Sequence, residues 1–187
     1  MERRGQMIFY RLLDEALTRN AQHDEAYSLL ARALKASYGI ESFTLEKGAH
    51  GKPYLSEYPN IHFNISHCKG LAICGISEGN IGVDAELIRP YSGRAAGKIF
   101  SEQELDYVGK SSCPDEAFFR IWTLKEALGK NIGTGLTFDM AKYSFTFEGG
   151  QPLCKGYPEK IFTQKILQKK WVVSICADDT ENIFEEY

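Results

Sequence analysis

Apolar positions in the first part of the chain recur at helical spacing and then change to strand spacing. In segments 7–19 and 25–38 they return every three or four residues, which predicts two helices. Gly39 follows the second segment as a helix stop signal. Segment 61–87 instead alternates apolar and polar residues between short turns. It predicts an antiparallel meander of three strands, 61–66, 71–77 and 81–87.

The rest of the chain repeats this order of helices followed by strands. A linker at 89–93 precedes a capping box, Ser101 with Glu104, which predicts a helix to about residue 108. Further patterns predict a long helix at 115–130 and strands at 143–147, 160–167 and 171–176. We therefore expect an α+β fold of two pseudo-symmetric halves, 1–90 and 91–187. Each half would contain a helix and an antiparallel three-stranded meander.

Composition narrows the classes of function. The 22 basic and 25 acidic residues give a net charge of −3, which disfavours a dedicated nucleic-acid-binding protein. No run of about 18 apolar residues is present, so we expect no membrane span. The five cysteines are odd in number and form no CxxC pair, which disfavours a disulfide framework. We expect a monomer in the cytoplasm with reduced thiols.

Two acidic residues stand two apart on the third predicted strand. Asp84 and Glu86 should face the same side of that strand, because side chains alternate along it. Adjacent carboxylates repel one another unless a cation lies between them, and an oxygen-only pair suits Mg²⁺. The alternative is that both belong to the solvated face of a half-buried strand.

A third carboxylate lies on the long helix. Glu126 follows Trp122 and precedes Lys130 at four-residue steps, so it lies at the edge of an aromatic stripe. It could complete a metal site or act as a general base. Lys125 and Lys130 flank it and could hold phosphate oxygens. The alternative is an ordinary surface ion pair between Glu126 and Lys130.

Polar groups also gather at one strand end and one turn. Ser66 and His67 end the first predicted strand, and His67 could donate a hydrogen bond to a phosphate. Lys52 and Pro53 follow Gly51 in a rigid turn that could stack on a flat base. A turn histidine and a plain turn are the alternatives. No Walker loop or GxGxxG motif occurs, so side chains would have to bind any phosphate.

Five segments, spread over about residues 24–176, resemble the 4′-phosphopantetheinyl transferases in order and spacing. The likeness is strongest to the type that activates surfactin synthetase, a single chain with two pseudo-symmetric α+β halves. The segments are 51–53 (GKP), 63–67 (FNISH), 82–86 (GVDAE), 100–104 (FSEQE) and 122–127 (WTLKEA). The resemblance implies Mg²⁺-dependent transfer of phosphopantetheine from coenzyme A to a serine of a carrier protein, with release of adenosine 3′,5′-bisphosphate.

The resemblance assigns roles to the acidic and basic residues. It implies that Asp84, Glu86 and Glu126 bind the metal. Glu126 resembles the base that deprotonates the incoming serine, and Lys130 joins it as a candidate catalytic residue. Lys125 and Lys130 match lysines near the pyrophosphate.

The remaining roles concern the nucleotide end of coenzyme A. Ser66 and His67 resemble the site of the 3′-phosphate, and Lys52 and Pro53 resemble the turn beside the adenine. Arg32 matches a family arginine. Segment 24–26 lacks the basic residue that we expect in larger members. Segment 100–108 resembles the part of family members that contacts the carrier protein.

Two other functions remain open at this point. A metal-dependent nuclease could use the same three carboxylates and a lysine, but it would need a basic track for nucleic acid. An inactive relative that only binds coenzyme A is the second alternative. The three carboxylates and two lysines together favour the transferase.

Overall fold

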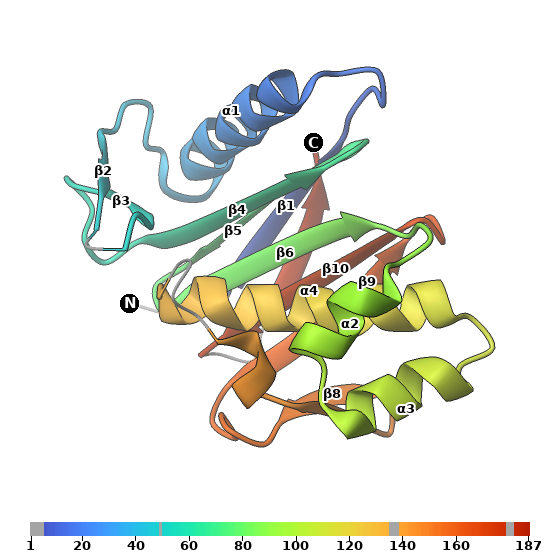
Figure 1. The fold of residues 1–187 in the computed structure, drawn as a ribbon. Coiled ribbons are helices and arrows are strands. Elements are labelled where there is room, and N and C mark those ends of the chain that lie inside the picture. Colours follow the sequence, from blue (N-terminus) through green and yellow to red (C-terminus); the bar gives the residue numbers. More distant parts are fainter. Residues whose placement is uncertain (1–5, 49, 135–138, 179–181) are drawn as a thin grey trace.

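The computed structural model describes residues 6–48, 50–134, 139–178 and 182–187. Its chain alternates strands and helices in the order shown in Figure 1. The elements are β1 (Gln6–Leu12), α1 (Arg19–Tyr38), β2 (Leu45–Lys47), β3 (Pro53–Leu55), β4 (His62–Cys68), β5 (Leu71–Ser77), β6 (Ile81–Leu87), α2 (Gly93–Ile99), α3 (Glu102–Lys110), α4 (Pro114–Ile132), the 3₁₀ turn η2 (Met140–Lys142), β7 (Phe145–Glu148), β8 (Gln151–Cys154), β9 (Ile161–Leu167), β10 (Trp171–Ala177) and β11 (Asn182–Glu186). The predicted α+β class is confirmed.

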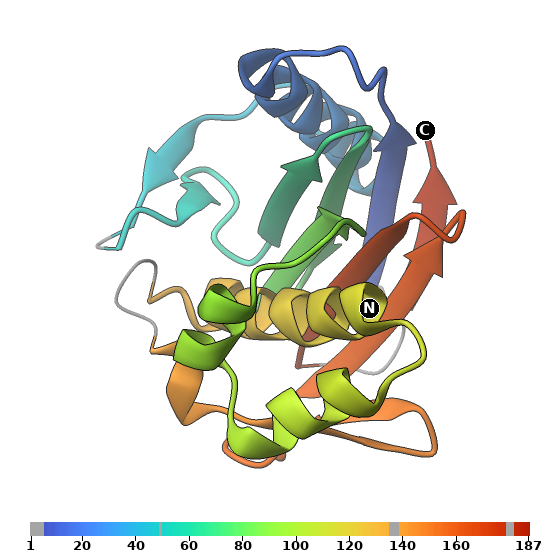
Figure 2. The ribbon, with the colours of Figure 1, turned by 45° about the vertical axis from the view of Figure 1, so that its right-hand side comes forward.

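Two sheets stack between two long helices (Figures 1 and 2). One sheet has the strand order β11-β1-β5-β4, and α1 covers its outer face. The other has the order β6-β10-β9, and α4 covers its outer face. Aliphatic side chains from both inner faces, including Ile8, Ile73, Val83 and Ile175, are buried between the sheets. Their removal from water is the main stabilising contribution to this arrangement.

The N-terminal segment is a strand, so the prediction of a helix at 7–19 is wrong. Ile8 packs between the two sheets, while Phe9 packs against α1 on the opposite face of β1. A strand that is buried on both faces lacks a clean two-residue period, and its apolar run can be mistaken for a helix. The true helix starts at Arg19, because the Thr18 hydroxyl accepts a hydrogen bond from the Ala21 amide at 3.3 Å and caps it.

The predicted meander at 61–87 is correct for its first two strands and wrong for the third. β4 pairs with β5, but β6 pairs with β10. Both edges of β5 are occupied, one by β4 and the other by β1, so β6 cannot pair with β5 as a three-stranded meander would require. It passes across the face of β5 instead. At Gly75 a Cβ atom would lie only 2.7 Å from Ile81 Cδ1.

Strand pairing also connects the two predicted halves. β6 pairs with β10, and β1 pairs in parallel with β11. Helix α2 begins at Gly93, the last residue of the predicted linker. The second predicted meander is wrong in its first strand, because β7 forms a hairpin with β8 and only β9 and β10 pair as expected. The capping box of Ser101 and Glu104 and the long helix α4 are confirmed.

A glycine on β6 allows α4 to lie directly against this strand. A Cβ atom at Gly82 would be 2.1 Å from the Ala127 carbonyl oxygen and 2.4 Å from the Asn131 nitrogen. Asn131 is buried and donates hydrogen bonds to the carbonyl groups of Asn80 and Cys176. This close contact fixes the side chains of α4 relative to those of β6.

Within the described ranges, no helix has the length and apolar character needed to cross a membrane. All five cysteines are free, and three of them are buried. Burial raises the pKa of the Cys68 and Cys74 thiols, so these two side chains are poor nucleophiles.

Candidate active site

The candidate site lies where β4, an edge strand of one sheet, meets β6, an edge strand of the other. These strands run in the same direction and are joined by side chains. Asn64 Oδ1 accepts a hydrogen bond from the Val83 amide at 2.9 Å, and Ser66 Oγ accepts one from the Ala85 amide at 3.3 Å. Ser66 also donates to Asp84 Oδ1 at 3.0 Å. Ser66 therefore positions an acidic residue of β6 at this junction.

A pocket of about 390 Å³ opens at the junction, with walls from α1, β4, β6 and α4. It is lined by Arg19, His23, Tyr27, Pro53, Asn64, Ile65, Ser66, His67, Asp84, Glu86, Trp122, Glu126 and Lys130. The three predicted metal-binding carboxylates thus line one pocket, as does His67. On α4 the half-buried positions Trp122, Glu126 and Lys130 lie four residues apart on a helix that is otherwise largely buried.

The carboxylates are held close to cationic side chains. Lys130 Nζ lies 2.7 Å from Asp84 Oδ1, and Arg89 Nη1 lies 2.7 Å from Glu86 Oε2. Burial and the Asp84 charge raise the pKa of Glu126, and the Lys130 ammonium offsets this in part. Burial also raises the pKa of Glu86, against the lowering effect of its hydrogen bond from Arg89. The free site therefore carries unfavourable negative charge.

Among the described residues, no three acidic, histidine or cysteine side chains are grouped closely enough to form a complete metal site. The donors nevertheless suit a hard cation, since carboxylate oxygens are the preferred ligands of Mg²⁺. Asp84 is 6% exposed, and its Oδ2 is buried without a hydrogen-bond partner in the described part of the chain. This carboxylate oxygen, in a pocket that Glu86 and Glu126 also line, fits a divalent cation.

The first three turns of α1 contribute a basic and aromatic face that sequence reasoning missed. Arg19, His23 and Tyr27 lie four residues apart and line the pocket opposite His67. The ring centroids of His23 and His67 are 5.6 Å apart. Burial, followed by the His23, Arg19 and Lys130 charges, lowers the pKa of His67. An anion bound here would reverse that effect, because it would stabilise protonated imidazole.

A second pocket, of about 420 Å³, adjoins the first. The two share the lining residues Pro53, Asn64, Glu126 and Lys130, and the second adds His50, Gly51, Lys52, Gly129, Gly133 and Met140. Lys52 Nζ donates to the carbonyl groups of Ile81 and Asn131, both at 3.3 Å. Burial lowers the pKa of Lys52 to about 8. The turn at Lys52 and Pro53 therefore lies at the edge of the candidate site.

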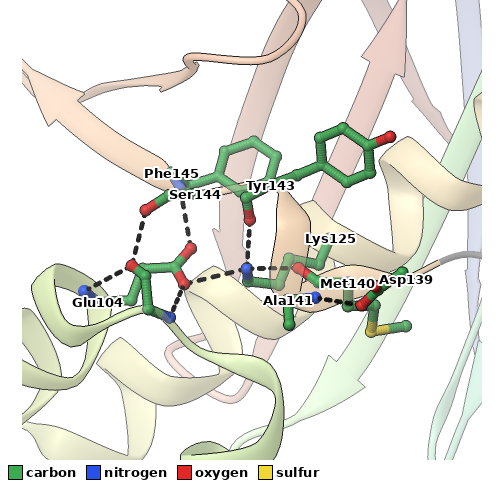
Figure 3. Close-up of polar contacts among 9 residues, drawn as sticks. Glu104, Lys125, Asp139, Met140, Ala141, Tyr143, Ser144 and Phe145 are labelled. Carbon is green, nitrogen blue, oxygen red and sulfur yellow. Dashed lines mark hydrogen bonds and ion pairs between the residues drawn. The ribbon is translucent and has the colours of Figure 1, made fainter.

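Two predicted binding residues lie elsewhere. Lys125 is fully buried, and its Nζ lies 3.0 Å from Glu104 Oε2, so the prediction that it contacts pyrophosphate is wrong for this structure (Figure 3). Lys125 comes one residue before Glu126, about 100° away around the helix, and its side chain contacts Glu104 of α3 instead of lining the pocket. Arg32 lies on the exposed face of α1 beside Lys35, in a separate surface pocket.

Comparison with known proteins gives the same family as the motifs. The family model described as the 4′-phosphopantetheinyl transferase superfamily matches residues 80–176, which is just over half of the chain. A 4′-phosphopantetheinyl transferase of Bacillus subtilis is 31% identical over 121 residues, which cover 62% of this chain and 54% of the relative. The corresponding protein named gsp, of Aneurinibacillus migulanus, is 33% identical over 132 residues, which cover 65% of this chain and 55% of the relative.

A human relative extends the match further along the chain. The L-aminoadipate-semialdehyde dehydrogenase-phosphopantetheinyl transferase is 30% identical over 164 residues, which cover 77% of this chain and 50% of the relative. The chain spans about half the length of these relatives. The matched segment contains β6 and α4, which carry the three carboxylates. The chain belongs to the 4′-phosphopantetheinyl transferase superfamily.

Proposed function

We propose that this protein transfers the 4′-phosphopantetheine group of coenzyme A to a serine of an acyl or peptidyl carrier protein and releases adenosine 3′,5′-bisphosphate. The observation that carries the proposal is the composition of one cleft. It combines three carboxylates, one of which has the unpartnered oxygen Asp84 Oδ2, with basic side chains from α1, β4 and α4. Coenzyme A carries a pyrophosphate and a separate 3′-phosphate. The carboxylates would bind a cation at the pyrophosphate, and the basic side chains would bind phosphate oxygens directly.

Asp84, Glu86 and Glu126 are the residues that would hold Mg²⁺. The ion would supply charge neutralisation at the pyrophosphate, which favours departure of the bisphosphate leaving group. The raised pKa values of Glu86 and Glu126 support this assignment, because a cation would stabilise the charged forms that burial and, to a lesser extent, the Asp84 charge disfavour.

The basic residues divide between the two phosphate positions of coenzyme A. Lys130 borders both pockets and is suited to the pyrophosphate. Arg19, His23 and His67 form a group of their own at one end of the first pocket and are suited to the 3′-phosphate. Segment 24–26 lacks the basic residue that we expected near the 3′-phosphate, and these three residues would take its place.

Glu126 is the residue that would accept the serine proton. The serine oxygen attacks the phosphorus that bears the pantetheine arm, and the bond from that phosphorus to the bridging oxygen of the bisphosphate breaks. The raised pKa of Glu126 brings this carboxylate closer to the range in which a general base works well near neutral pH. Glu126 borders both pockets, so it lies between the proposed metal and nucleotide positions.

The carrier protein is proposed to bind beside α3. This helix follows Phe100 and exposes Leu105, which is 38% accessible and available for an apolar contact. We place the reaction in the cytoplasm, where carrier proteins and coenzyme A meet, and the five free cysteines are compatible with that compartment.

Calorimetric titration with coenzyme A, with and without Mg²⁺, tests this function. We expect binding that tightens when Mg²⁺ is present and weakens when dephospho-coenzyme A, which lacks the 3′-phosphate, replaces coenzyme A. Absence of binding in both conditions would contradict the proposal. Binding without subsequent transfer to any apo carrier protein would identify an inactive relative that binds coenzyme A.

A further inference from the structure

Lys125 and Glu104 form a fully buried ion pair behind the second pocket. Both side chains are 0% exposed, and Lys125 Nζ lies 3.0 Å from Glu104 Oε2 (Figure 3). The same ammonium group donates hydrogen bonds to the carbonyl oxygens of Met140, at 2.9 Å, and Tyr143. These two carbonyls belong to the first residue of η2 and to the residue that follows it. Lys125 thereby connects α4 to the backbone on both sides of this short turn.

Glu104 holds the other end of the pair through backbone donors. Its Oε2 accepts a hydrogen bond from the Ser101 amide at 2.7 Å, and its Oε1 accepts one from the Phe145 amide at 2.8 Å. The hydroxyls of Ser101 and Ser144 lie 2.7 Å apart beside it. The carboxylate therefore joins the start of α3 to the start of β7 and fixes the position of the Lys125 ammonium.

Stability alone gives a weak reason for this arrangement. Moving two charges out of water is costly, and apolar side chains of similar volume often stabilise a core equally well. Burial lowers the pKa of Lys125, which reflects this cost, although the nearby Glu104 charge opposes the shift. The pair differs from an apolar replacement in one respect, because it supplies donors that hold two defined backbone carbonyls.

The segment that Lys125 holds is part of the pocket wall. Met140 lines the second pocket together with Gly129 and Gly133 of the α4 end and with the turn at Lys52. Lys125 itself is buried and does not line the pocket. A change at Lys125 would therefore reach the pocket through η2 and leave the carboxylates of the first pocket in place.

We propose that Lys125 is a positioning residue, which Glu104 orients so that it fixes η2 as a wall of the second pocket, where the turn at Lys52 and Pro53 would border the adenine of coenzyme A. This assignment rests on the proposed function. It replaces direct pyrophosphate contact by Lys125 with an indirect effect on binding.

The test compares Lys125→Met with the double variant Lys125→Met/Glu104→Gln. The single variant leaves a buried carboxylate unpaired and can fail to fold, whereas the double variant removes both charges. Thr123→Val is the matched control, because Thr123 is buried on the same helix and its hydroxyl lies 2.7 Å from Ser174 Oγ, on β10. Hydrogen exchange at the Lys142 and Tyr143 amides and steady-state kinetics are measured for each folded protein.

We expect faster exchange at both amides in the variants. In the wild type the Lys142 and Tyr143 amides donate hydrogen bonds to the carbonyl oxygens of Asp139 and Met140. The KM for coenzyme A should rise about tenfold with little change in kcat, since only the binding wall is disturbed. The KM for dephospho-coenzyme A should rise by the same factor, because the residues proposed to bind the 3′-phosphate, Arg19, His23 and His67, are unchanged. The control should change neither exchange nor KM.

A double variant with wild-type exchange and wild-type KM would overturn the assignment. A fall in kcat without a change in KM would also overturn it, as would failure of both variants to fold, which would give the pair a role in stability alone. If the wild-type protein itself binds no coenzyme A, the proposed function fails. The exchange measurement still decides whether Lys125 holds η2.

Discussion

Lys130 Nζ lies 2.7 Å from Asp84 Oδ1, and the same nitrogen donates to the Val83 carbonyl at 3.0 Å. One side chain of α4 is thereby bound to both the backbone and the carboxylate of β6. The other oxygen of Asp84 is buried without a partner in the described ranges. A cation at that oxygen would share Asp84 with Lys130, so metal binding and the position of this lysine should be linked.

Asp84→Asn should remove transfer activity and leave the fold intact. The amide keeps the size of the side chain and an oxygen that can accept from Ser66, but it loses the charge that a cation and Lys130 require. We expect a loss of at least about 10²-fold in turnover, as for other removed electrostatic groups. Transfer assays and circular dichroism measure the two effects.

The control for this variant is Glu41→Gln, which removes an exposed carboxylate 2.7 Å from Lys35. It should leave activity unchanged, because exposed ion pairs contribute little. Normal turnover of Asp84→Asn at any Mg²⁺ concentration would show that Asp84 is not a metal ligand.

Glu126→Gln should stabilise the metal-free protein near neutral pH. Burial and the Asp84 charge raise the pKa of Glu126 above its value in the unfolded chain, so the folded chain binds the proton more tightly. Stability is then complete below the ordinary glutamate pKa and is lost as pH rises through the raised value. Urea unfolding at neutral and acidic pH, without divalent cations, measures this difference.

The gain from Glu126→Gln should disappear at acidic pH, where the wild-type side chain is already protonated. Glu148→Gln is the control, since Glu148 is exposed at the end of β7 and should show no such pattern. Equal stability of Glu126→Gln and wild type at neutral pH would mean that Glu126 is not held in an unfavourable charged state.

His67→Ala should weaken coenzyme A binding more than dephospho-coenzyme A binding. The loss of one charge-assisted hydrogen bond to the 3′-phosphate is worth roughly 1.5–3 kcal/mol. His62→Ala is a control on the same strand, because His62 lines a different pocket. Calorimetry with both ligands checks the difference, and equal losses for the two ligands would exclude His67 from the phosphate site.

Gly82→Ala should strongly destabilise the protein. The added Cβ atom would lie 2.1 Å from the Ala127 carbonyl oxygen, and backbone atoms of α4 cannot move aside as a flexible side chain can. We expect a loss of about 3 kcal/mol or more in the free energy of unfolding.

Gly97→Ala is the matched control for that change. Gly97 lies in α2 with no atom within 4 Å of an added Cβ, so alanine should raise stability by about 0.5–1 kcal/mol through helix propensity. Urea denaturation measures both variants. A Gly82→Ala protein with wild-type stability would contradict the close packing of β6 and α4.

The parts of the fold with a clear period were predictable from sequence. The alternation at β4 predicted that Phe63 and Ser66 face opposite sides of the strand. In the structure Phe63 packs in the core cluster beneath α1, and Ser66 bonds to β6. The four-residue spacing on α4 predicted that Glu126 and Lys130 share one helix face, and both line the same pocket. Local patterns of this kind are decided by burial of one face and are visible within a short segment.

Long-range pairing was not predictable in the same way. β1 is buried on both faces, so its sequence hides the strand period. Its place beside β5 leaves no free edge there for β6, which pairs with β10 instead. The basic face of Arg19 and His23 was missed for a related reason, since the helix start at Thr18 lay inside a segment read as a different helix. Lys125 was assigned by motif, although its helical angle could have placed it away from Glu126.

The mass of an apo carrier protein after incubation with this protein, coenzyme A and Mg²⁺ tests the central claim most directly. We expect the carrier protein to gain one phosphopantetheine group on a serine, together with one equivalent of adenosine 3′,5′-bisphosphate. The gain should disappear when Mg²⁺ is chelated and when Asp84→Asn replaces the wild type. An unchanged carrier mass with acyl and peptidyl carrier proteins, under conditions in which coenzyme A is bound, would contradict transfer by this chain.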